Sequence, residues 1–121
     1  MRTSARIRRM CAHDNPALIR LLAEYRERMG AKFGSRLLEM RLFGSYARGT
    51  AHEGSDVDVA VVLDRVGSHA ERVFPMELAG DLSIEHGFLI IPIVVSIDEL
   101  KFLRAREELL AENLDRDGIA I

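Results

Sequence analysis

The chain has 121 residues, of which 48% are apolar and 30% are charged, and its 17 basic and 19 acidic side chains leave a formal net charge of −2. A chain of this length can bury the core of one globular domain, and so balanced a charge argues against broad nucleic-acid binding. The single cysteine, Cys11, cannot form an internal disulfide, and no apolar run approaches the roughly 20 residues of a membrane span. We therefore expect one cytoplasmic domain over residues 1–121, with residues 1–12 as a flexible basic arm and with neither a membrane nor a nucleic acid as partner.

The first half of the chain predicts one long helix and two strands. Apolar residues recur on one face from Pro16 to Met29, so we expect a helix there that Gly30 stops. The segment 37–43, LLEMRLF, predicts a first strand, and the segment 57–63, VDVAVVL, predicts a second. Because the second strand is apolar at almost every position, we expect it to lie deep in the fold or to be covered on both faces.

The next two elements each contain a proline. We expect a helix over residues 68–86, which Pro75 begins or kinks, and a strand over residues 88–95, FLIIPIVV. Proline has no N–H group to donate within a sheet, so Pro92 predicts an edge or bulged position for this strand.

The last expected elements are a helix and a short strand. Ser96 and Glu99 have the spacing of a capping box, and leucines then keep one face apolar until RDG at 116–118 ends the helix. Residues 119–121, IAI, predict a short final strand. Strands that alternate with helices of this length specify an α/β domain with about four strands.

A glycine and a serine directly follow the first expected strand. Gly44 and Ser45 stand at the turn into a short helix, where backbone N–H groups, a hydroxyl and a helix N-terminus can bind an anion. Arg48, one turn later, can add a full positive charge. The alternative interpretation is that Gly44 only permits the turn and that Ser45 only caps the helix.

Two aspartates stand at the start of the second expected strand. In an extended chain Asp56 and Asp58 point to the same side with their Cα atoms roughly 6–7 Å apart, so their carboxylates repel each other unless a cation lies between them. Oxygen ligands favour Mg²⁺ or Mn²⁺, which takes its remaining ligands from water and substrate phosphates. The alternative is a solvated strand entry, which the nearby Gly-Ser turn makes the weaker interpretation. A P-loop is excluded, because no lysine precedes Thr50.

These residues together resemble a known family. Gly44 and Ser45, then ten residues, then two aspartates with one residue between them, follow the pattern of the nucleotidyltransferase superfamily that includes DNA polymerase beta. The chain is most similar to the small stand-alone members, the minimal nucleotidyltransferases. The resemblance implies the nucleotidyltransferase fold, a small mixed sheet of about four strands with helices packed mainly on one face. It also implies that Gly44, Ser45 and Arg48 bind the nucleotide, and that Asp56 and Asp58 are the catalytic residues that ligate Mg²⁺.

The reaction that the resemblance implies is transfer of a nucleoside monophosphate from a nucleoside triphosphate, with ATP expected, to a hydroxyl of a protein or small molecule. Since so short a chain has no room for a separate acceptor-binding domain, we expect a second protein chain to complete the acceptor site. The resemblance suggests that this partner is a helical HEPN-type toxin, with the present chain as its antitoxin. The alternative is a catalytically weak or inactive module that binds a nucleotide or a partner.

One element of the resemblance is missing. Active members place a third acid on a later strand, but FLIIPIVV contains none, and Pro92 lies about where that acid is expected. Asp81, Glu85 or Asp98 would have to replace it, or the acceptor or a partner must supply the base. Nucleotide binding is therefore a firmer expectation than catalysis.

The remaining polar candidates have weaker signals. The four histidines lack metal-ligand spacing, so we expect no zinc site. His52 lies in the loop between the Gly-Ser turn and the aspartates, where it either touches a phosphate or faces solvent. Arg104 and Arg106 either reach the open face of the sheet or belong to a solvated helix surface, which is the interpretation we favour.

Overall fold

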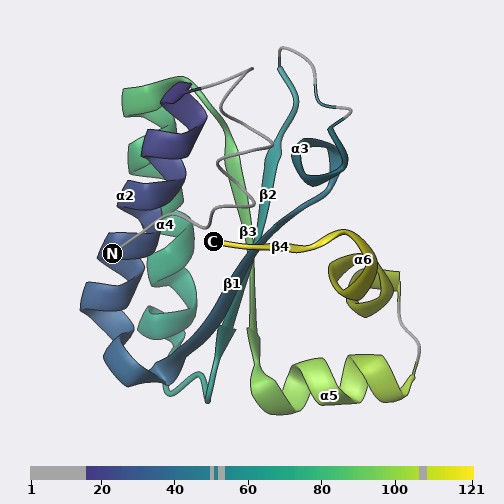
Figure 1. Cartoon of the computed structure of the whole chain (residues 1–121). Helices are drawn as coiled ribbons and strands as arrows, with labels where there is room; N and C mark the ends of the chain where they lie inside the picture. The colour runs from purple at the N-terminus through teal and green to yellow at the C-terminus, as the bar shows by residue number, and fades with distance from the viewer. Residues whose placement is uncertain (1–15, 50, 52–53, 107–108) are drawn as a thin grey trace.

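A computed structural model of the chain describes residues 16–49, 51, 54–106 and 109–121. The strands are β1 (Leu37–Phe43), β2 (Val57–Leu63), β3 (Ile90–Ser96) and β4 (Ile119–Ala120), and the helices are α2 (Pro16–Phe33), the 3₁₀ turn η1 (Gly34–Arg36), α3 (Ser45–Arg48), α4 (His69–His86), α5 (Ile97–Ala105) and α6 (Leu109–Asp117). The four strands form one sheet in the order β3-β2-β1-β4 (Figure 1). β1 runs antiparallel to β2 and β4, whereas β3 runs parallel to β2. The expected α/β class and the expected small mixed sheet of four strands are confirmed.

The strand β2 is the centre of the fold. Its side chains alternate between two hydrophobic cores, a larger one that holds its odd-numbered residues from Val57 to Leu63 and a smaller one that holds Ala60 and Val62. Successive side chains of a strand point to opposite faces, so the two cores lie on opposite faces of the sheet. The expectation that this apolar strand is covered on both faces is confirmed.

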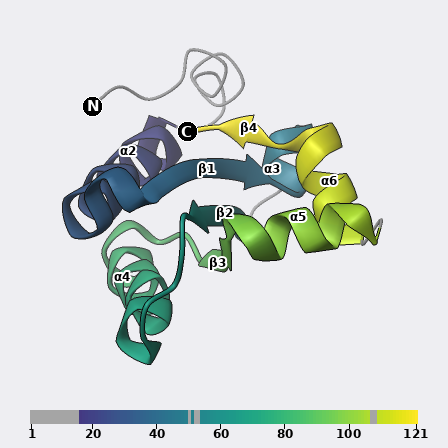
Figure 2. The same cartoon turned by 90° about the horizontal axis from the view of Figure 1, so that it is seen from below.

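The helices form a thick layer on one face of the sheet and a thin layer on the other. The 18-residue helices α2 and α4 contribute to the larger core, and the shorter α5 and α6 contribute to the smaller one (Figures 1 and 2). Inside the larger core, the Tyr25 hydroxyl of α2 donates a hydrogen bond of 2.9 Å to the carbonyl oxygen of Pro75 in α4. Most of the helical chain therefore packs on one face, as expected from the family resemblance.

The first helix is longer than the sequence predicted. α2 continues through Gly30 and ends at Phe33, so the prediction that Gly30 stops the helix was wrong. Phe33 is buried in the larger core, and its ring meets that of Phe74 edge-on with centroids 5.9 Å apart. This packing outweighs the roughly 1 kcal/mol that a glycine costs inside a helix.

The last expected helix is in fact two helices. α5 ends before α6 begins, so the prediction of one continuous helix was wrong. Arg104 of α5 binds Asp115 of α6, with 2.8 Å between Nη2 and Oδ1, whereas these residues would be about 16 Å apart along one straight helix. The break allows Leu100 and Leu114 to reach the same small core. Arg104 and Arg106 are both exposed, as expected for a helix surface.

Three local features of the later elements bear on the sequence predictions. β3 lies at an edge of the sheet, as Pro92 predicted, although it starts two residues later than expected. The predicted capping box is present, and the Glu99 N–H group donates to the Ser96 hydroxyl at 3.0 Å. Pro75 lies inside α4, whose N-terminal cap is Ser68.

Some expectations fall outside the described residues. These are the basic arm over residues 1–12, with Cys11, and the loop residue His52. Among the helices that the structure describes, none combines the length and the apolar character needed to cross a membrane.

Tyr25→Phe tests the hydrogen bond that joins α2 to α4. Burial raises the pKa of the Tyr25 hydroxyl, which keeps it protonated as a donor. Removing this hydroxyl is expected to lower the free energy of unfolding by about 0.5–1.5 kcal/mol, measured by urea denaturation. Tyr25→Ala also leaves a cavity and is expected to cost about 3–5 kcal/mol. Equal losses for the two variants would contradict a separate contribution from the hydrogen bond.

Candidate active site

The two motifs of the sequence meet at one end of the sheet. Because β1 and β2 are antiparallel, with Phe43 paired with Asp58, the chain leaves β1 beside the point where it enters β2. α3 starts at Ser45, directly after this turn, and ends at Arg48. The Gly-Ser turn and the two aspartates are therefore neighbours in space, although a loop separates them in the chain.

Gly44 is required both by its backbone and by its neighbour. Its φ of +74° and ψ of −153° lie in a region that only glycine adopts at low cost. A Cβ at this position would lie 3.1 Å from the Cγ atom of Asp58 and closer still to a carboxylate oxygen. The absent side chain therefore leaves the space that the Asp58 carboxylate occupies.

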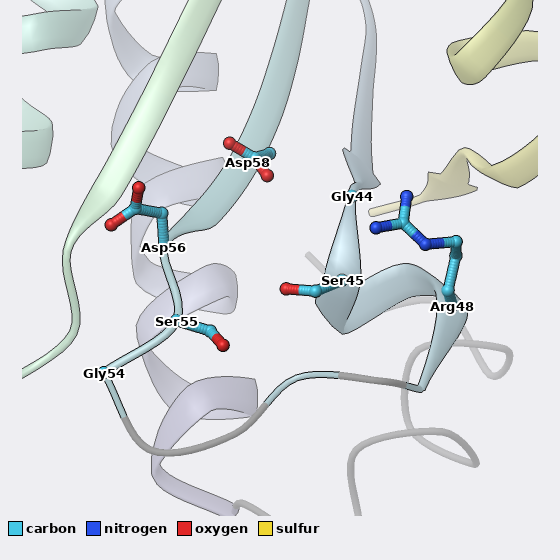
Figure 3. Close-up of a pocket in the computed structure, with 7 residues that line it drawn as sticks. All are labelled: Gly44, Ser45, Arg48, Gly54, Ser55, Asp56 and Asp58. Carbon is cyan, nitrogen blue, oxygen red and sulfur yellow. The ribbon is translucent and has the colours of Figure 1, made fainter.

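A pocket of about 390 Å³ opens at this end of the sheet (Figure 3). All five residues that the sequence singled out lie in its wall, and two further residues join them; together they are Gly44, Ser45, Arg48, Gly54, Ser55, Asp56 and Asp58. The Ser45 hydroxyl points from α3 toward the side of the pocket that holds the aspartates (Figure 3). Gly54 and Ser55 were missed, and the only signal in the sequence was their position directly before Asp56.

The carboxylates give the pocket a negative side. Burial raises the pKa of the Asp58 carboxyl, the negative charge of Asp56 raises it further, and the positive charge of Arg48 lowers it. A carboxyl group whose pKa is raised by a neighbouring carboxylate is one whose charged form a bound cation would stabilise. Since carboxylate oxygens are the ligands that Mg²⁺ and Mn²⁺ prefer, Asp56 and Asp58 fit such a cation.

The opposite side of the pocket carries the positive charge. α3 has only four residues, so an anion placed there would meet the amides of one helical turn and Arg48, and not a long helix dipole. Arg48 is exposed, and its charge reaches far enough to lower the pKa of Asp58. The pocket thus places a cationic wall on α3 across from an anionic wall on β2.

The position beside Asp58 on the neighbouring strand is not the one expected. Pro92 pairs with Val59, whose side chain points into the larger core, whereas Ile91 pairs with Asp58. Paired residues on neighbouring strands share a face of the sheet, so Ile91 flanks Asp58 and Pro92 points to the other side. The prediction for Pro92 was wrong by one residue, and a shift of one residue changes the face.

None of the three acids considered as replacements faces Asp58. Asp81 and Glu85 belong to α4, which covers the opposite face of the sheet. Asp98 follows the end of β3 that pairs with Leu63, which lies about 17 Å along the sheet from Asp58.

A second group of candidate ligands lies between α2 and α4, on the other face of the sheet. Ligand atoms of Glu24, Glu85 and His86 lie within 4.8 Å of one another, and His86 Nε2 is 3.1 Å from Glu24 Oε2. Spacing along the chain could not reveal this group, because Glu24 and His86 are 62 residues apart. Glu24 also pairs with Arg28, so ordinary ion pairing accounts for its position.

Residues 22–114 match the family model described as the nucleotidyltransferase domain. The chain therefore belongs to the nucleotidyltransferase domain family, and the resemblance inferred from its two motifs is confirmed.

Two proteins of Methanocaldococcus jannaschii named as protein adenylyltransferases are similar to this chain. The first is 36% identical over 91 residues, which are 72% of this chain and 60% of that protein. The second is 31% identical over 77 residues, which are 64% of this chain and 78% of that protein. The chain thus spans less than two thirds of the length of the first of these relatives.

Solved structures share the fold. A Sulfolobus solfataricus protein described as a nucleotidyltransferase superposes with a TM-score of 0.56 at 19% identity, over 99% of this chain and 89% of that one. A chain from a crystal structure of a toxin–antitoxin with AMP-PNP gives a TM-score of 0.56 at 24% identity, over 80% of this chain and 69% of that one. These likenesses confirm the nucleotidyltransferase fold.

Gly44→Ala and Gly49→Ala separate backbone strain from the contact with Asp58. Both glycines have a positive φ, but a Cβ on Gly49 would meet no atom within 4 Å. We expect Gly49→Ala to cost about 1–2 kcal/mol of unfolding free energy and Gly44→Ala about 3 kcal/mol, measured by urea denaturation.

The same two variants distinguish a site defect from a fold defect. Since only Gly44→Ala displaces the Asp58 carboxylate, only this variant is expected to lose affinity for Mn²⁺ in a calorimetric titration. Equal stability and equal Mn²⁺ affinity for the two variants would show that Gly44 is no more than a turn residue.

Proposed function

We propose that the protein is a nucleotidyltransferase that uses Mg²⁺ or Mn²⁺ to transfer a nucleoside monophosphate, with ATP as the expected donor, to a hydroxyl of a protein or small molecule. The observation that carries the proposal is the pocket in which Ser45 and Arg48 lie across from Asp56 and Asp58. A triphosphate suits the cationic wall, and its cation suits the anionic wall. Membership of the nucleotidyltransferase family supports the reaction class, and the names of two relatives support an adenylyl group and a protein acceptor.

Each wall of the pocket has its own role in this proposal. The Ser45 hydroxyl, the amides of the first turn of α3 and the Arg48 guanidinium bind the triphosphate oxygens. Asp56 and Asp58 would hold the cation, and the absent side chain of Gly44 leaves room for the Asp58 carboxylate. When bound, the cation neutralises phosphate charge and helps to orient the α-phosphate for attack.

The transfer itself exchanges one phosphorus–oxygen bond for another. The acceptor oxygen bonds to the α-phosphorus, the bond to the pyrophosphate oxygen breaks, and the hydroxyl proton passes to water or to a base that the acceptor or a partner supplies. Among the described residues, only Asp56 and Asp58 bring carboxylates to the pocket wall. The described residues therefore contribute positioning and charge, and the lack of a dedicated base among them is expected to slow transfer by roughly 10²–10⁴-fold.

A second protein chain is part of the proposal, with a helical HEPN-type toxin as the candidate. Support comes from the resemblance to minimal nucleotidyltransferases and from the protein adenylyltransferase names of the relatives. Two neighbours in fold come from crystal structures of a toxin–antitoxin, one of them with AMP-PNP. Co-expression of the tagged chain with the product of the adjacent reading frame tests this part, and the expected result is a complex that survives purification.

A nucleotide-binding module without transfer activity is the second candidate. The observation that favours it is the apolar Ile91 beside Asp58, where an acid would be expected in an active transferase. Tight, cation-dependent nucleotide binding without transfer to any protein of a source lysate would select this candidate.

Removal of the divalent cation is expected to abolish nucleotide binding. ATP brings negative charge toward a pocket wall that already carries two carboxylates, so it needs a cation between them. Isothermal titration calorimetry with ATP in Mg²⁺ and in EDTA measures the effect. Equal affinity under the two conditions would mean that Asp56 and Asp58 are not cation ligands.

Three substitutions separate binding from transfer. Ser45→Ala is expected to weaken nucleotide binding by about 1.5–3 kcal/mol, the value of one hydrogen bond to a charged group. Asp58→Asn is expected to abolish transfer of label from α-labelled ATP to lysate proteins. Asp81→Asn, an exposed acid on α4, is the matched control and should retain the parental activity. Transfer that survives Asp58→Asn would place the reaction elsewhere.

A further inference from the structure

Ile91 occupies the place from which a third side chain could reach the cation. β3 pairs with β2 in parallel register, and Ile91 lies opposite Asp58. Neighbouring strands are about 4.8 Å apart, and paired residues point to the same face. The side chain at position 91 therefore stands directly beside the Asp58 carboxylate, and it is 38% exposed, so it is not locked into a core.

The positions around Ile91 offer no substitute. Pro92 points to the opposite face, since its partner Val59 lies in the larger core. Ile93, the next residue of β3 on the face of Asp58, is apolar and packs against the smaller core. The described part of β3 therefore carries no carboxylate on the face of Asp58, and none of its residues is among those that line the pocket.

We propose that Ile91 keeps the described part of the site at two carboxylate ligands, so that the divalent cation binds weakly to the protein alone and tightly only together with the triphosphate. This inference rests on the proposed function, because it concerns the cation that Asp56 and Asp58 would hold. The affinity of an oxygen-ligand site for a divalent cation follows the number of charged ligands. With two carboxylates the site is short of ligands, and phosphate oxygens must complete it.

Position 91 is tested by placing a carboxylate on each face of β3. Mn²⁺ without nucleotide is titrated into the parent, Ile91→Asp and Pro92→Asp, and free Mn²⁺ is followed by electron paramagnetic resonance. Ile91→Asp is expected to bind Mn²⁺ at least about tenfold more tightly than the parent. Pro92→Asp adds the same charge on the wrong face and is expected to leave the affinity within about twofold. Equal gains for both variants, or none for Ile91→Asp, would overturn the proposal.

Ile91→Asn controls for the loss of the apolar side chain. It is similar in size and shape to aspartate but uncharged, so it is expected to match the parent in Mn²⁺ affinity. A gain as large as that of Ile91→Asp would assign the effect to polarity instead of a third ligand, and would contradict the proposal.

A measurement on the parent protein does not depend on any variant being folded. Mn²⁺ bound at Asp56 and Asp58 broadens nearby nuclear magnetic resonance signals steeply with proximity, so isoleucine methyl groups report the position of the cation. The Ile91 methyl signal is expected to broaden first. The signal of Ile97, the first residue of α5, is expected to broaden later, because six residues of extended chain separate it from Ile91 by about 20 Å. The reverse order would remove Ile91 from the cation site.

The outcomes separate this inference from the proposed function. Parent protein that binds Mn²⁺ neither alone nor with ATP would reject the proposed function itself. Parent protein that binds Mn²⁺ equally well with and without ATP would keep a cation site and reject the role of Ile91. The expected result is a gain in Mn²⁺ affinity of at least tenfold when ATP is present.

Discussion

The carboxylate of Asp58 occupies the space that any side chain at position 44 would need, and this close approach is the constraint on which the site depends. Through this contact the residue that follows β1 packs directly against the second residue of β2. The turn at Gly44 adopts a backbone conformation that suits glycine alone, and α3 begins at the next residue. The same approach brings the cationic side of the pocket within electrostatic reach of the acid.

The strand β2 serves the core and the site at once. Its odd-numbered residues and the pair Ala60 and Val62 hold the two hydrophobic cores together. Asp58 lies on the face of the smaller core, at the end of the strand where the pocket opens. Because the strand is buried along its length, the carboxylate is held on a rigid element instead of a loop, which is the arrangement that precise positioning of phosphate oxygens requires.

The sequence predicted those parts of the fold that depend on local chemistry. The bounds of β1 and β2 are as expected, because Gly44 and Asp56 mark them, and the cap formed by Ser96 and Glu99 is also local. Five of the seven pocket residues could be named because their two motifs are recognisable in the sequence, and the antiparallel pairing of β1 and β2 then brings the motifs together. The end of α2 depended instead on the distant contact between Phe33 and Phe74.

Other errors also arose where distant parts of the chain decide the structure. The division of the last helix depends on how α5 and α6 share one small core. The expectation that Pro92, and not Ile91, lies beside Asp58 failed for the same reason, because the register between two strands cannot be predicted from the sequence of either strand alone. The part of the pocket wall that Gly54 and Ser55 form likewise depends on the folded structure, and neither residue type indicated a site in the sequence.

The edge of the sheet has a consequence for how any partner can approach. Val57 donates its N–H to the carbonyl of Leu89 at 2.8 Å. In a parallel ladder the backbone N–H and C=O groups of Ile91 then also point toward β2, and the backbone nitrogen of Pro92 points away from the sheet. An outward proline offers no donor to an incoming strand, and it interrupts the row of groups through which sheets extend from one molecule into the next. Strand addition along this edge is therefore disfavoured, which leaves side-chain surfaces as the better contact for a protein that approaches the pocket from this side.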